Sequence, residues 1–157
     1  MNLYIKQHVF SWNDRFSIYD EYGNERFYVE GELFSWGKKL HLYDLSGMEL
    51  AYIEQKLFSF LPRYYIYRGE NMIAEVVREF SLFKPRYSVG GFGWEVEGDF
   101  WNHEYEVLDK GQSIVSVSKE WFSWGDAYEL RFAPYVDEIA ALAVVLVIDA
   151  CIDADND

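Results

Sequence analysis

Apolar and polar residues alternate in short runs along most of the chain. The runs are rich in β-branched and aromatic residues, as at positions 16–19, 40–43, 64–67 and 114–117. A period of two places successive side chains on opposite faces of a strand. Because a turn sequence lies beside each run, the pattern predicts antiparallel β-hairpins with their apolar side chains directed inward.

A short motif recurs in step with this alternation. Phe-Ser followed by a large apolar residue occurs five times, at positions 10–12, 34–36, 58–60, 80–82 and 122–124. Successive copies begin 24, 24, 22 and 42 positions apart, and Phe100-Trp101-Asn102 stands where a degenerate copy is expected. The chain is therefore predicted to repeat one structural unit, a β-hairpin.

Turn residues mark the midpoint of each repeat. Asp20–Gly23 and Asp44–Gly47 share the form D-x-x-G, and variants occur at positions 68–71, 90–91 and 109–111. The Asp side chain accepts hydrogen bonds from the backbone that follows it, and Gly adopts positive φ at little cost. These sequences predict tight hairpin turns.

The repeats allow the strands to be counted. Five hairpins contribute ten strands, and an opening strand over residues 3–10 and a closing strand over residues 127–132 make twelve. An open sheet of that size would expose two edges, whereas a closed barrel exposes none. We therefore expect a closed antiparallel barrel within a single domain, residues 1–157, with a sandwich as the alternative.

The pattern changes after Pro134. Residues 139–148 are uniformly apolar and follow Asp137 and Glu138, which suit the first turn of a helix. We predict a helix over residues 135–152, about 27 Å long. The ten-residue apolar run is shorter than the ~20 residues of a membrane span, so no transmembrane span is expected. A buried strand over residues 144–148 is a further alternative, because β-branched residues are dense there.

A helix that is apolar on all sides must be surrounded by protein. Four alanines, Ala140, Ala141, Ala143 and Ala150, keep this one slim. A barrel of twelve strands has a lumen too wide for its own side chains to fill easily. The sequence therefore predicts that the helix threads the barrel and leaves no central cavity for a ligand.

Composition narrows the class of protein. The 157 residues carry a formal net charge of −13, half are hydrophobic and 20% are aromatic. The apolar content argues against a disordered chain and the acidity against nucleic-acid binding. We expect the aromatic side chains to line the wall around the helix. The single cysteine, Cys151, is expected to be an inert buried thiol, and the absence of signal-peptide features predicts a cytoplasmic location.

Several of these features resemble the LURP-one-related family. The resemblance is carried by Ser35-Trp36-Gly37, the turn Asp44–Gly47, the hairpin repeat and the apolar C-terminal helix. This family belongs to a superfamily with the tubby C-terminal domain and the phospholipid scramblases. The resemblance implies a twelve-stranded barrel around a central helix. Tubby-like domains bind phosphoinositide headgroups through basic residues on the barrel exterior, so the resemblance also implies a binding module, and it carries no catalytic motif over to this chain.

Basic residues concentrate in one part of this acidic chain. Residues 56–86 hold six basic and three acidic residues, whereas residues 87–157 hold three and fifteen. We predict an anion or headgroup site formed by Lys56, Arg63, Arg68, Arg78, Lys84 and Arg86. Alternatively, these are solvated strand positions that pair with local carboxylates.

Paired glutamates, tryptophans and histidines are weaker candidates for metal binding, catalysis or sugar binding. The pairs Glu95/Glu97 and Glu104/Glu106 would each share one strand face, as calcium ligands or an acid/base pair would. Four Trp residues could bind sugars, but they recur with the repeat, which favours a structural role: Trp12, Trp36, Trp101 and Trp124. The three histidines, His8, His41 and His103, are isolated in sequence. We predict no catalytic residue, metal or cofactor.

Together these observations predict a cytoplasmic, non-enzymatic binding or scaffold module. Its expected partner is a membrane phospholipid headgroup or a protein, and not a nucleic acid. The alternative function is a protein–protein interaction module without lipid binding. A calcium-dependent or carboxylate-based activity of the acidic C-terminal third is a remoter alternative.

Overall fold

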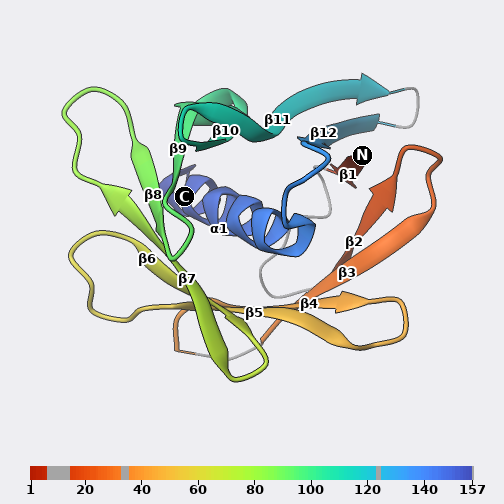
Figure 1. Ribbon diagram of the computed structural model, residues 1–157, viewed down its shortest axis with the longest axis horizontal. Coiled ribbons are helices and arrows are strands. Elements are labelled where there is room, and N and C mark those ends of the chain that lie inside the picture. The colour runs from red at the N-terminus through yellow and green to blue at the C-terminus, as the bar shows by residue number, and fades with distance from the viewer. Residues whose placement is uncertain (7–14, 33–35, 123–124, 157) are drawn as a thin grey trace.

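The structure, a computed structural model, describes residues 1–6, 15–32, 36–122 and 125–156. Twelve antiparallel strands in these ranges form a closed barrel around a single helix, which confirms the predicted architecture and excludes the sandwich (Figure 1). The strands are β1 (Asn2–Lys6), β2 (Arg15–Asp20), β3 (Glu25–Gly31), β4 (Lys39–Asp44), β5 (Glu49–Gln55), β6 (Arg63–Arg68), β7 (Asn71–Glu79), β8 (Arg86–Gly90), β9 (Trp94–Asp99), β10 (Glu104–Asp109), β11 (Gln112–Phe122) and β12 (Gly125–Phe132).

The barrel closes between the first and last strands. Each strand pairs with its neighbours in the chain, and β1 pairs with β12 in a register that sets Leu3 opposite Leu130. The closing strand begins at Gly125, two residues earlier than predicted. The opening strand was predicted over residues 3–10, and positions 7–10 lie outside the described residues.

The two ends of the barrel have different connections. We call the end with the five hairpin turns the turn end, and the end with the connections between hairpins the loop end. At the turn end, Asp20 Oδ1 accepts hydrogen bonds from the backbone N–H groups of Tyr22 and Asn24, both at 2.9 Å. Asp44 Oδ1 does the same for Ser46 and Met48, at 2.9 and 3.0 Å. Both D-x-x-G turns are confirmed.

Helix α1 (Glu138–Asn156) runs through the lumen from the turn end to the loop end (Figure 1). Asp137 caps its first turn, because its Oδ1 accepts a hydrogen bond from the Ala140 N–H at 3.1 Å. At the loop end, Lys38 Nζ donates to the Ala150 carbonyl oxygen at 3.3 Å. The predicted helix is confirmed, although it begins three residues later than expected since Asp137 occupies the capping position. The alternative strand over residues 144–148 is wrong.

Most of the buried side chains of the barrel wall are aliphatic. Residues 140–148 of α1 are fully buried, and the most buried strand residues facing them include Leu3, Ile5, Ile18 and Leu42. Some aromatic rings do point inward, such as Tyr64 and Tyr105. Cys151 is buried, as expected. In the part of the chain that the structure describes, no helix is long and apolar enough to cross a membrane.

The prediction that the aromatic side chains line this wall is confirmed only in part, because the described residues of the repeated Phe-Ser motif do not line it. Trp36, Phe58 and Phe80 are 82%, 100% and 73% exposed. The physical reason is their position, since the motif falls in the connections at the loop end, beyond the strand segments that contact α1. Trp12 and Trp124 lie outside the described residues.

Candidate functional site

The structure brings five of the six predicted basic residues to the loop end. Lys56 follows β5, Arg63 begins β6, Arg78 lies near the end of β7, Lys84 precedes β8 and Arg86 begins it. Four of these positions belong to two connections, residues 55–63 and 79–86, and Arg78 lies next to the second connection. We call this region, together with the apolar residues of the same two connections, the loop-end surface.

The sixth residue, Arg68, lies at the turn end and has a structural role. Its guanidinium donates hydrogen bonds to both carboxylate oxygens of Asp137, at 2.8 and 2.5 Å. Burial of Asp137 opposes ionisation, but the hydrogen bonds from Arg68 and from the Ala140 backbone outweigh it and lower the pKa of Asp137. Arg68 therefore anchors the start of α1 and does not contribute to the loop-end surface.

Backbone hydrogen bonds fix the first connection to the end of β7, from which the second connection starts. The Lys56 N–H donates to the Arg63 carbonyl oxygen at 2.9 Å, which closes the base of the first connection. The Arg78 N–H donates to the Pro62 carbonyl oxygen at 3.0 Å, which joins the first connection to the end of β7. Basic residues separated by up to 30 positions in sequence therefore share one rim.

The charges on this rim differ in how strongly they are engaged within the protein. Arg63 forms an ion pair with Glu75. Arg86 lies 3.8 Å from Glu95, with both side chains more than half exposed, so this pair contributes little to stability. Lys56 and Lys84 are exposed and form no ion pair with any residue that the structure describes. These two lysines and Arg86 are the cations most available to a ligand.

Sequence reasoning missed the apolar part of the same surface. Phe58, Phe60 and Phe83 are 100%, 95% and 94% exposed, and they extend from the same two connections as the lysines. Leu82 and Phe80 are strongly exposed as well. The available signal was the position of the Phe-Ser motif midway between successive turns, which is where connections between hairpins must lie.

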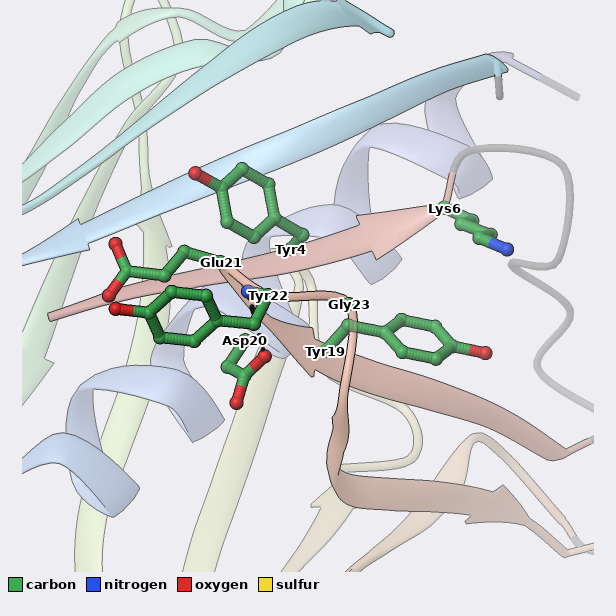
Figure 2. A pocket seen from close by; sticks show the side chains of 7 residues that line it. All are labelled: Tyr4, Lys6, Tyr19, Asp20, Glu21, Tyr22 and Gly23. Carbon is green, nitrogen blue, oxygen red and sulfur yellow. Dashed lines mark hydrogen bonds between the residues drawn. The ribbon is translucent and has the colours of Figure 1, made fainter. Parts of the chain in front are cut away.

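A separate hollow of about 430 Å³ lies on the barrel exterior near the turn end. Its lining residues are Tyr4, Lys6, Tyr19, Asp20, Glu21, Tyr22 and Gly23 (Figure 2). Figure 2 shows the rings of Tyr19 and Tyr22 pointing in opposite directions and Lys6 lying apart from both carboxylates. Because Asp20 also holds its own turn, these groups do not converge on a common ligand position.

The predicted carboxylate pairs do share strand faces, on the barrel exterior. Glu95 and Glu97 are exposed on β9, Glu104 and Glu106 are exposed on β10, and Glu97 lies opposite Glu106 in the register. Among the described residues, no three acidic, His or Cys side chains are grouped closely enough to hold a metal ion.

The two described histidines contact carboxylates in different settings. His41, on the outer face of β4, lies 2.9 Å from Glu32 through Nε2 and 2.7 Å from Glu49 through Nδ1. Burial lowers the pKa of His41, but the hydrogen bonds to both glutamates outweigh burial and raise it. His103 Nδ1 lies 3.9 Å from the buried Asp149 of α1. His8 lies outside the described residues.

The interior polar cluster includes a tyrosine of β10. Tyr105 OH donates to Asp149 Oδ1 at 2.8 Å, and burial followed by the nearby Asp149 charge raises the pKa of Tyr105. Asp149 Oδ2 and His103 Nδ1 have no hydrogen-bond partner among the described residues. The cluster is enclosed in the half of the lumen nearest the loop end, so it is part of the core and not of the exposed surface.

The fold and its loop-end surface define a class of protein, a twelve-stranded barrel closed around its C-terminal helix. The model of the LURP-one-related family matches residues 1–149, so the chain belongs to that family, as the sequence resemblance predicted. The "Uncharacterized protein YxjI" of Bacillus subtilis (strain 168) is 41% identical over 157 residues, or 100% of this chain and 97% of that relative.

A solved structure supports the same architecture. The X-ray structure of a protein from Arabidopsis thaliana matches with a TM-score of 0.68 over 96% of this chain and 90% of that chain. The sequence identity is 18%, so this similarity shows the fold alone.

Proposed function

We propose that the protein is a non-enzymatic module that binds membranes rich in anionic phospholipids through its loop-end surface. The observation that carries the proposal is the convergence of five basic residues on one rim, with Lys56, Lys84 and Arg86 available to a ligand. Phosphate groups of lipid headgroups provide the complementary charge. The proposal places the protein in the cytoplasm, where the membrane surface carries anionic lipids.

The attraction is modest in size. Each Lys or Arg near an anionic surface contributes ~1 kcal/mol, so three available cations contribute about 3 kcal/mol. The net charge of −13 opposes it. We therefore expect reversible binding that weakens steeply as salt screens these charges.

Co-sedimentation with lipid vesicles tests this proposal. The wild-type protein should pellet with phosphatidylserine-containing vesicles at low salt and much less with pure phosphatidylcholine vesicles. The double variant Lys56→Glu/Lys84→Glu should bind the anionic vesicles at least about tenfold more weakly.

The matched control changes the same amount of charge at the other end of the barrel. Arg26 and Lys110 are exposed near the turn end, so Arg26→Glu/Lys110→Glu gives the same net charge as the loop-end variant. The control should bind anionic vesicles nearly as well as the wild type. Equal losses in both variants would show that only the net charge matters, and would contradict a site at the loop end. Absence of binding at low salt would favour a protein partner instead.

A further inference from the structure

We infer that the loop-end surface does more than attract headgroups: its exposed phenylalanines insert into the boundary between lipid headgroups and acyl chains. This inference rests on the proposed function and identifies the partner as the bilayer itself. It starts from the exposure of Phe58, Phe60 and Phe83, which have almost no protein contact. Scattered exposed apolar residues are ordinary, whereas several large ones on adjacent loops mark an interaction site.

The backbone conformation of the first connection, residues 55–63, directs the Phe58 side chain into solvent. Phe58 has a φ of 59°, in the left-handed region that residues other than Gly rarely adopt. Beside it, Leu57 packs against Gly37, where an added Cβ would lie 2.7 Å from Leu57 Cδ2. Leu57 therefore holds the loop against the rim while the next residue turns its ring to solvent. Backbone strain of this kind is characteristic of functional sites.

The positive charge of the loop-end surface favours an anionic membrane as its binding partner. The two connections, residues 55–63 and 79–86, carry a formal charge of +3 within a chain of −13. Lys56 lies two residues before Phe58, and Lys84 directly follows Phe83. Alternating cationic and aromatic side chains suit an anionic interface, where the charges meet phosphates and the rings enter the apolar boundary.

The shape of the surface also favours a bilayer. The phenylalanine rings project from loop tips, as insertion into lipid requires. A neighbouring hollow of about 380 Å³ includes Phe80, but its other lining residues are mainly polar or charged, among them Glu79 and Glu95. It therefore does not offer an apolar pocket to a protein side chain.

A fluorescent reporter at the loop tip tests insertion directly. Cys151 is buried, so a cysteine introduced by Phe58→Cys can be labelled selectively with the environment-sensitive dye NBD. With vesicles containing one part phosphatidylserine to two parts phosphatidylcholine, NBD emission should shift to the blue and increase severalfold. Nitroxide-labelled lipids should quench it. The matched control, Leu45→Cys at the turn end, should show neither effect, although Leu45 is also exposed.

A second variant separates insertion from headgroup attraction. Phe58→Ser/Phe60→Ser/Phe83→Ser keeps every charge and removes only exposed rings, so its thermal unfolding should match that of the wild type. It should bind anionic vesicles at least tenfold more weakly at moderate salt while keeping salt-sensitive binding at low salt. Leu45→Ser/Met48→Ser/Met72→Ser, an equal change at the turn end, should bind like the wild type.

The outcomes distinguish the two proposals. Binding to anionic vesicles without an NBD shift would overturn insertion and leave headgroup binding intact. An equal NBD shift with neutral and anionic vesicles would support insertion and overturn the headgroup proposal. Absence of binding to any vesicle would overturn both. If the wild type is a dimer in solution without vesicles and the triple Phe variant is a monomer, the occupant is a second copy and insertion is wrong.

Discussion

The turn end of the barrel and its loop-end surface carry opposite formal charges, and these charges have different partners. The five hairpin turns, residues 20–25, 44–49, 68–71, 90–94 and 109–112, have a formal net charge of −5. The carboxylates of Asp20 and Asp44 hold their own turns, and Asp137 holds Arg68 and the first turn of α1. At the loop end, Lys56 and Lys84 form no ion pair with the described residues.

This difference indicates which charges maintain the fold and which are available for binding. A carboxylate that accepts several hydrogen bonds stabilises its own turn and cannot be removed without cost. An exposed lysine without an ion pair contributes little to folding. The comparison therefore predicts that removing a hydrogen-bonded carboxylate at the turn end lowers stability, whereas changes to the exposed residues of the loop-end surface alter binding alone.

The largest expected effect on stability lies inside the barrel, beneath the loop end. Tyr105→Phe removes the hydroxyl that donates to Asp149 and leaves this buried carboxylate without its 2.8 Å partner. We expect the free energy of unfolding to fall by about 3 kcal/mol, since an unsatisfied buried polar group costs about 1–3 kcal/mol and more when charged. Urea denaturation measures the change.

A surface tyrosine provides the control for this prediction. Tyr65 lies on the outer side of β6, between the buried Tyr64 and Ile66. Tyr65→Phe should change the free energy of unfolding by less than about 0.5 kcal/mol. An equally small effect of Tyr105→Phe would mean that the Asp149 side chain does not depend on the Tyr105 hydroxyl for its stability in the core. The hydrogen bond between β10 and α1 would then contribute little to the stability of the barrel.

A smaller loss of stability is expected at the turn end. Asp137→Ala removes the cap of α1 and the partner of Arg68, and should lower the free energy of unfolding by about 2 kcal/mol. Thermal unfolding of the variant measures the loss. Lys84→Ala, at the loop end, should leave stability unchanged within about 0.5 kcal/mol. Equal losses in the two variants would contradict the contrast between the ends.

Sequence periodicity was sufficient to predict the architecture. Hairpins repeat locally, so a count of turns such as Asp20–Gly23 and Asp44–Gly47 gave twelve strands, and edge closure gave the barrel. The apolar run at residues 139–148 indicated a helix enclosed by protein. These predictions succeeded because hairpin turns and an apolar helix are each determined by residues that are close together in the sequence.

The candidate site was harder to predict because it depends on which end of a strand each residue occupies. Arg63 begins β6 and Arg68 ends it, so Arg63 lies at the loop end and Arg68 at the turn end. Composition could not separate them. Likewise, Phe58 has the residue type of a core position, and only its place between hairpins shows that it faces solvent.

The smallest effect concerns a histidine on the outer wall. Both ring nitrogens of His41 face carboxylates, Glu32 toward the loop end and Glu49 toward the turn end. This geometry favours the doubly protonated ring, in which both N–H groups donate, and the pKa of His41 is raised above its ordinary value of 6.5. A raised pKa adds stability that is fully present below the unfolded-state pKa and is lost as pH rises through the folded-state pKa.

Replacing this histidine therefore predicts a pH-dependent loss of stability. The difference in unfolding free energy between wild type and His41→Gln should be largest near about pH 6 and should shrink toward about pH 9. Because His41 and both glutamates are partly exposed, the change should stay below about 1 kcal/mol. Urea denaturation across this range measures it, and carboxylates shared by both proteins cancel in the difference. A difference that grows with pH would show that neutral His41 is the stabilising form, and would contradict a stabilising ion pair between His41 and Glu49.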